Sequence, residues 1–150
     1  IMSILHFERK AMPVIPEHRP MYKICQVLLI LNISSTGGKS SLIRLHLFNW
    51  ALKDKTREKM LVSSSKSGVI SFGVWGIDPV LNMAINFGVA EDLISTVSTG
   101  FQITKSGKDF LTNGNIQALF KDDAETLTLI GKSITEKMVK DVARRWKDEV

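Results

Sequence analysis

The sequence of 150 residues contains a single cysteine, Cys25, and no run of about 20 apolar residues. A lone cysteine cannot form an internal disulfide, which favours a reducing compartment. The apolar run at residues 24–33 is stopped by the polar and glycine residues 34–38 and is too short to cross a bilayer. We therefore expect a cytoplasmic protein that makes no contact with a membrane.

Residue groups that carry out chemistry are also missing. His6, His18 and His46 are far apart and have no Cys, Asp or Glu at metal-ligand spacing. Nothing in the sequence marks a Ser or Cys nucleophile with a base and an orienting acid. The turn GGKSS at residues 37–41 resembles part of a phosphate-binding loop, but that pattern requires a glycine where Ile33 stands. We expect no catalytic residue, no metal and no cofactor, and hence no enzyme; His46, in an apolar segment, is expected to be structural.

Positive charge is absent from the middle of the chain. The net charge is +5, with eleven Lys or Arg against four acids in residues 1–66, and nine against eight in residues 105–150. Residues 67–104 hold three acids and no basic residue. Because affinity for DNA is built mainly on phosphate neutralisation, this middle segment is poorly suited to bind DNA.

The first half of the chain predicts an extended arm followed by helices. Three prolines within residues 1–20 disfavour a long helix, and the residues from Met21 onward have the composition of a central core helix. The segments that follow are predicted to be a helix capped by Ser40 or Ser41, a helix or charged turn at 54–61, a break in regular structure at 63–68, and a short strand at 69–74.

The second half predicts a helix, a hairpin and further helices. Asp78 and Pro79 are typical of a helix start and Gly88 of a helix end, so residues 79–87 should be helical. The remaining segments are predicted to be a hairpin of strands around 93–97 and 101–104, a helix at 105–113 capped by Thr104, a short apolar turn at 116–120, a helix at 124–131, and a last helix whose apolar stripe runs from Ile134 to Trp146.

This order of elements is that of a winged-helix domain, in which the hairpin is the wing. We predict an α+β, mostly helical fold made of a winged-helix-like domain with an additional C-terminal helix. The expected organisation is an extended N-terminal arm at residues 1–20, the winged-helix-like domain at 21–113, and a C-terminal helical extension at 114–150.

The charge pattern argues against the usual mode of DNA recognition. The helix at 79–87 and the wing at 95–103 hold the polar residues Asn82, Asn86 and Gln102 but no basic residue. Their apolar character suits burial against protein. Predicted protein-interface residues are Trp75, Met83, Phe87, Phe101, Arg144, Arg145 and Trp146. Predicted contacts to nucleic acid or an acidic partner, with a solvated helix face as the alternative, are Lys39, Arg44, Lys53, Lys55, Arg57 and Lys59.

Residues 18–53 resemble the small middle component of bacterial ABC-three-component systems, the group that includes Lamassu-type anti-phage defence. The resemblance rests on His18-Arg19-Pro20, on Gly38–Ser41 and on the segment Leu45–Leu52, and Thr104–Gly107 agrees with it. It implies a non-enzymatic subunit bound to an SMC-like ABC ATPase and to an effector, commonly a nuclease, in a complex that senses foreign DNA.

Two functions are therefore expected. The first is an adaptor that bridges the ATPase and the effector nuclease, with double-stranded DNA reached through the complex. The second is a winged-helix transcriptional regulator that binds operator DNA as a dimer.

Overall fold

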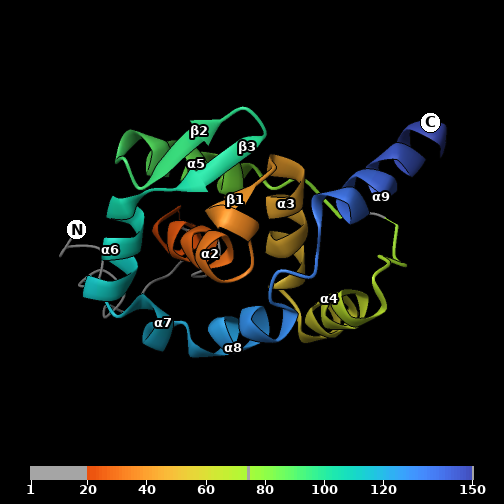
Figure 1. Ribbon diagram of the computed structural model, residues 1–150, viewed down its shortest axis with the longest axis horizontal. Coiled ribbons are helices and arrows are strands. Elements are labelled where there is room, and N and C mark those ends of the chain that lie inside the picture. The colour runs from red at the N-terminus through yellow and green to blue at the C-terminus, as the bar shows by residue number, and fades with distance from the viewer. Residues whose placement is uncertain (1–19, 74, 150) are drawn as a thin grey trace.

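The computed structural model describes residues 20–73 and 75–149, without the side chains of residues 146–149. The fold is α+β and mostly helical, with one small antiparallel sheet (Figure 1), which confirms the predicted class. Apart from Pro20, the predicted arm lies outside the described residues. The elements are α2 Pro20–Ile33, η2 Thr36–Gly38, β1 Lys39–Ser40, α3 Leu42–Ala51, α4 Lys55–Ser67, α5 Pro79–Ala90, β2 Ile94–Val97, β3 Gly100–Ile103, α6 Lys105–Asn113, α7 Ile116–Leu119, α8 Lys121–Ile130 and α9 Glu136–Glu149.

Helix α2 forms the centre of the molecule, as predicted. It begins at Pro20, where the missing N–H of proline leaves no helical bond unmade. Residues 23–31 are all buried, because α5, α6, α8 and α3 pack around the helix (Figure 1). This cover on every side explains why the apolar residues of α2 do not follow a single stripe.

A chain of buried polar side chains crosses this core. The Lys23 ammonium on α2, 1% exposed, donates to the amide oxygens of Asn49 at 2.7 Å and Gln26 at 3.2 Å. Gln26 in turn donates to the Asp123 carboxylate on α8 at 2.8 Å. Burial raises the pKa of Asp123, and the bond from Gln26 opposes the rise. These bonds satisfy polar groups that would otherwise be costly to bury.

The predicted cap of α3 is confirmed, whereas the predicted break at 63–68 is wrong. The Ser41 hydroxyl accepts a hydrogen bond from the Arg44 N–H at 3.3 Å. Helix α4, capped by Asp54, runs through the serines and ends at Gly68, whose φ of 82° is left-handed. The serines do not stop the helix because their hydroxyls bond to backbone carbonyls of the preceding turn, as Ser64 does with Met60 at 3.0 Å.

Of the segment 69–74, where a strand was predicted, the structure describes residues 69–73. None of these residues belongs to a strand, so for them the prediction is wrong. Two of their three apolar side chains pack inward: Ile70 enters the core, and the half-buried Phe72 ring stacks on Trp50 with centroids 5.2 Å apart, whereas Val69 is exposed. The apolar content of the segment therefore reflects anchoring of a long connection and not strand pairing.

The sheet has the order β1-β3-β2, and the predicted hairpin supplies two of its strands. The third, β1, was not predicted; it lies between α2 and α3 and pairs Lys39 with Gln102. Helix α5 continues past Gly88, where a helix end was predicted. Gly88 instead permits close packing, since an added Cβ would lie 2.7 Å from Cδ1 of Ile94 on β2.

Helices α6 to α9 complete the same core. The side chain of Thr104 caps α6 as predicted, accepting from the Gly107 N–H at 2.9 Å. Leu127 on α8 and Val142 on α9 belong to one buried cluster with the residues of α2. Residues 114–145 thus share their core with the preceding domain, and α9 ends at one extremity of the molecule (Figure 1).

Candidate functional site

The start of α5 is held by side chains of α3 and of the residues just after it. The Asp78 carboxylate caps α5 by accepting from the Val80 N–H at 2.9 Å, and it also accepts from Lys53 Nζ at 2.9 Å and Asn49 Nδ2 at 3.2 Å. Burial raises the pKa of Asp78, but the bonds from Lys53, Asn49 and Val80 outweigh burial and lower the pKa to about 2. The carboxylate is therefore ionised at neutral pH and fixes the helix in place.

His46 on α3 fixes the next turn. Its Nδ1 accepts from the Asp78 N–H at 3.3 Å, which leaves Nε2 to donate to the Asn82 side-chain oxygen at 3.2 Å. Burial lowers the pKa of His46, while the bond with Asn82 opposes this. The expected structural role of His46 agrees with this geometry. The bond with His46 turns Asn82 inward. Asn82 is one of the three polar residues that the sequence places in the helix at 79–87 and the wing.

The exposed face of α5 is mostly apolar, and Asn86 is the one polar residue of the helix that is exposed. Met83 is 58% exposed and Phe87 is 36% exposed, and Ile77, just before the helix, is 78% exposed. Glu91 and Asp92 are exposed at the end of the helix. No basic residue lies between 67 and 104. We call Ile77, Met83 and Phe87 the α5 surface; Ile77 was not predicted, because nothing in the local sequence distinguishes it from a core residue.

Two other predicted interface residues contribute to packing. Trp75 is 3% exposed, and its indole N–H donates to the Ile43 carbonyl at 3.2 Å, so the prediction that it lies at the protein surface is wrong. Phe101, on β3, is half-buried against the core. Gln102, beside it, donates to the Gly37 carbonyl at 3.2 Å. A second of the three polar residues in the predicted helix and wing therefore bonds to the protein's own backbone.

Arg44, predicted to contact nucleic acid or an acidic partner, is buried and unavailable for that role. Its guanidinium donates to the Ile134 carbonyl at 2.8 Å, to the Ser35 hydroxyl at 2.8 Å and to the Ser34 carbonyl. Burial lowers its pKa to about 10, against the opposing effect of Glu136. Arg44 therefore joins the turn after α2 to the segment before α9.

The other five predicted basic contacts are divided among different environments. Lys39 is the exposed residue of the two-residue strand β1. Lys53 pairs with Asp78, and the Arg57 guanidinium lies 4.8 Å from the centre of the Trp50 ring. Only Lys55 and Lys59 share an exposed helix face, on α4. The six residues therefore do not form one basic patch.

The predicted C-terminal contacts lie on α9. Arg144 and Arg145 are exposed, and Arg145 donates to the Ile70 carbonyl at 3.2 Å. The side chain of Trp146 lies outside the described part of the chain. Met138 and Val142 of α9 line a hollow of about 350 Å³ together with Gly68, Val69 and Ile70.

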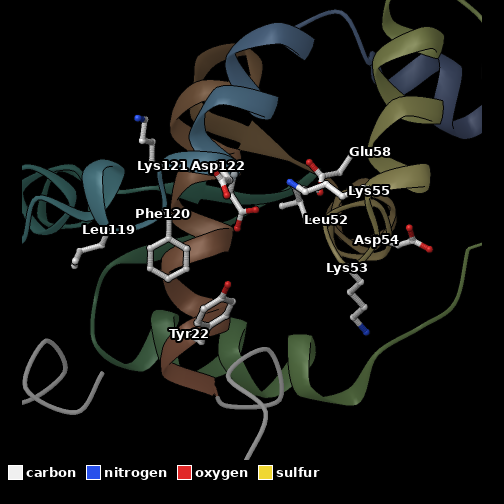
Figure 2. A pocket seen from close by; sticks show the side chains of 11 residues that line it. Tyr22, Leu52, Lys53, Asp54, Lys55, Glu58, Leu119, Phe120, Lys121 and Asp122 are labelled. Carbon is white, nitrogen blue, oxygen red and sulfur yellow. Dashed lines mark ion pairs between the residues drawn. The ribbon is translucent and has the colours of Figure 1, made fainter. Parts of the chain in front are cut away.

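A cavity of about 390 Å³ opens where α2, α4 and α8 meet (Figure 2). Lys55 and Glu58 extend into it from α4, while the Tyr22 and Phe120 rings, with centroids 4.8 Å apart, form its apolar side (Figure 2). Its charged residues are nearly balanced in sign: Lys53, Lys55 and Lys121 against Asp54, Glu58, Asp122 and Asp123. The cavity thus has no marked preference for an anion or a cation.

Comparison with known proteins gives no relative. No protein-family model matches the chain, and no curated protein or solved structure is significantly similar to it. Within the described residues, no group of three or more His, Cys, Asp or Glu side chains is arranged to hold a metal ion. None of the described helices has the length and apolar character needed to span a membrane.

Proposed function

We propose that the chain is a winged-helix-like adaptor that binds partner proteins through the α5 surface and has no enzymatic activity of its own. The order α2, β1, α3, α5, β2, β3 and the sheet order β1-β3-β2 support a winged-helix-like architecture, with α4 and the long connection after it inserted between α3 and α5. In that architecture α5 stands where the recognition helix of a DNA-binding winged helix stands.

The composition of the α5 surface is the observation that carries this proposal. A helix that reads DNA presents polar and basic side chains, because base edges and phosphates must be contacted. Here the exposed residues include Met83, Phe87 and one polar residue, Asn86, but no basic residue, whereas Asn82 is bonded to His46. Exposed Met and aromatic side chains are typical of protein interfaces.

The resemblance of residues 18–53 to the middle component of ABC-three-component systems suggests which partners the adaptor has. They are an SMC-like ABC ATPase and an effector nuclease of an anti-phage defence complex in the cytoplasm. In this proposal the chain links the two proteins, and double-stranded DNA is engaged by the assembled complex.

Co-purification of the chain with the products of its neighbouring genes tests the proposal. Met83→Glu should abolish association with one of them, whereas Leu119→Glu should not, although Leu119 on α7 has nearly the same exposure, 56% against 58%. Both variants should unfold at the wild-type temperature, because both side chains lie on the surface. A monomer that associates with no neighbouring product would overturn the adaptor assignment. Tight, sequence-selective binding of operator DNA by the chain alone would favour a regulator.

A further inference from the structure

A groove of about 470 Å³ runs between α4 and α8, on a side of the molecule formed by neither α5 nor the sheet (Figure 1). Its α4 wall carries Lys55, Lys59, Val62 and Lys66, and its α8 wall carries Thr126 and Leu129. We call this the lysine groove. The three lysines are spaced four and seven residues apart, which places them along one face of a helix.

Two of the three lysines lack a carboxylate partner. Lys55 Nζ lies 3.6 Å from the Glu58 carboxylate, which also accepts from the Thr126 hydroxyl at 2.7 Å. Within the described residues, no acid lies within ion-pair distance of Lys59 or Lys66. Glu58 is the one acid that lines the groove, while the exposed Glu125 lines the neighbouring hollow between α7 and α8, which shares Leu129 with the groove. The groove therefore has unbalanced positive charge.

The groove also has an apolar side chain on each of its two walls. Leu129 is 69% exposed, and Val62, opposite it on α4, is half-buried. An isolated exposed leucine needs no explanation, but here the apolar side chains lie in a concave surface edged by lysines. A ligand that fills the groove gains both apolar contact and charge pairing.

We propose that the lysine groove binds an acidic amphipathic helix of a partner protein. The rise of α4 from Lys55 to Lys66 is about 16 Å, which is the length of about three helical turns. A partner helix of that length can place apolar residues on Leu129 and Val62 while Asp or Glu side chains face Lys59 and Lys66. Helix-in-groove recognition of this kind reads apolar anchors at three- and four-residue spacing.

DNA fits the groove less well than an acidic helix does. The phosphate backbone gains from lysines but gains nothing from an exposed leucine between them, and two unpaired lysines supply only a small part of the usual phosphate contacts. The proposal extends the adaptor role, on which it rests for the identity of a second partner. The groove itself is defined independently of the α5 surface.

Fluorescence polarisation with synthetic peptides tests the proposal on the full chain. The probe is a fluorescein-labelled peptide of about 15 residues with Leu at helical spacing, Glu at the positions that face the lysines and Ala elsewhere, because a helix of this length is marginal and repulsion between many Glu side chains would unfold it. Saturable binding is expected. Leu129→Ser and the double variant Lys59→Glu/Lys66→Glu should each weaken it roughly tenfold, since one removes the apolar anchor and the other reverses two charges.

Charge reversal and matched controls complete the design. A probe with Lys in place of every Glu should bind the Lys59→Glu/Lys66→Glu variant better than it binds the wild type. Lys108→Glu on α6 and Ile77→Ser before α5 alter exposed residues outside the groove and should leave affinity unchanged. Ile77 belongs to the α5 surface. A loss of affinity in Ile77→Ser would therefore show that the peptide binds the α5 surface and not the groove.

Three results would overturn the assignment. The first is no saturable binding of the acidic probe up to about 1 mM. The second is binding that survives both groove variants. The third is a different occupant: a DNA duplex that binds more tightly than the peptide and independently of Leu129, or a homodimer that Lys59→Glu/Lys66→Glu converts to a monomer.

Discussion

The ammonium of Lys53, just beyond α3, lies 2.9 Å from the carboxylate of Asp78, which caps α5. The pair joins two helices that are separated in sequence by α4 and by the long connection after it. Since α5 carries the proposed interaction surface, the position of that surface depends on this bond and on the hydrogen bond from Asn49 to the same oxygen.

Replacing Asp78 with Asn should lower the free energy of unfolding by about 1 kcal/mol at pH 7, because Asn can still cap a helix but cannot pair with Lys53. The folded-state pKa of Asp78 is about 2 and the unfolded value is about 3.9. The stabilisation is therefore fully present above about pH 4 and is lost as the pH falls through about 2. Chemical denaturation of both proteins from pH 7 to 2 should show the difference shrinking over this window, and a constant difference would contradict the pairing.

Arg44→Lys should destabilise the protein by about 3 kcal/mol. Lysine cannot reproduce the planar set of bonds to Ile134, Ser35 and Ser34, and a buried cation would be left with fewer partners. Urea denaturation measures the loss. Arg57→Lys is the matched control, since Arg57 is partly exposed and packs on Trp50, and it should cost less than about 1 kcal/mol.

Glu136→Ala should cost about 1 to 2 kcal/mol, because the first turn of α9 also holds the start of α3. The Glu136 carboxylate accepts from the Ser41 N–H at 2.9 Å and from the Ser41 hydroxyl at 2.7 Å. Thermal unfolding provides the measurement. Glu125→Ala, at an exposed position of α8, should stay within about 0.5 kcal/mol of wild type, and equal effects of the two changes would argue against this link.

Gly107→Ala should be strongly destabilising, by about 2 kcal/mol or more, even though alanine favours helix. A Cβ at this position would lie 2.4 Å from the Leu93 carbonyl oxygen, and a backbone atom cannot move aside cheaply. Gly73→Ala is the control, because an added Cβ there meets no atom within 4 Å. A Gly107→Ala protein that unfolds at the wild-type temperature would show that α6 can shift away from the Leu93 carbonyl.

Elements fixed by neighbouring residues could be predicted from the sequence. Ser41, Asp78 and Thr104 act as caps where expected, since capping depends on a side chain and a backbone N–H within three residues. The central position of α2 followed from its composition. Each of these features depends on short-range chemistry.

Features fixed by distant partners could not be predicted in this way. The sequence alone places Arg44 and Lys23 on helix surfaces as readily as inside. Their burial depends in part on Ile134 and Asn49, which lie 90 and 26 residues further along the chain. Strand β1 has two residues and becomes a strand by pairing with β3. The lysine groove needs α4 and α8 side by side, and Leu129 gives no local sign of that arrangement.

The central place of α2 has a consequence for synthesis of the chain. Translation completes α2 at Ile33, but α8, which covers one side of it, begins only at Lys121. At elongation rates of about 5 to 20 residues per second, the ribosome takes about 4 to 17 s to make the intervening segment. During that interval a helix with apolar residues on every side has no complete cover. Until α8 has been made and has packed against α2, the nascent chain exposes apolar surface through which it can aggregate.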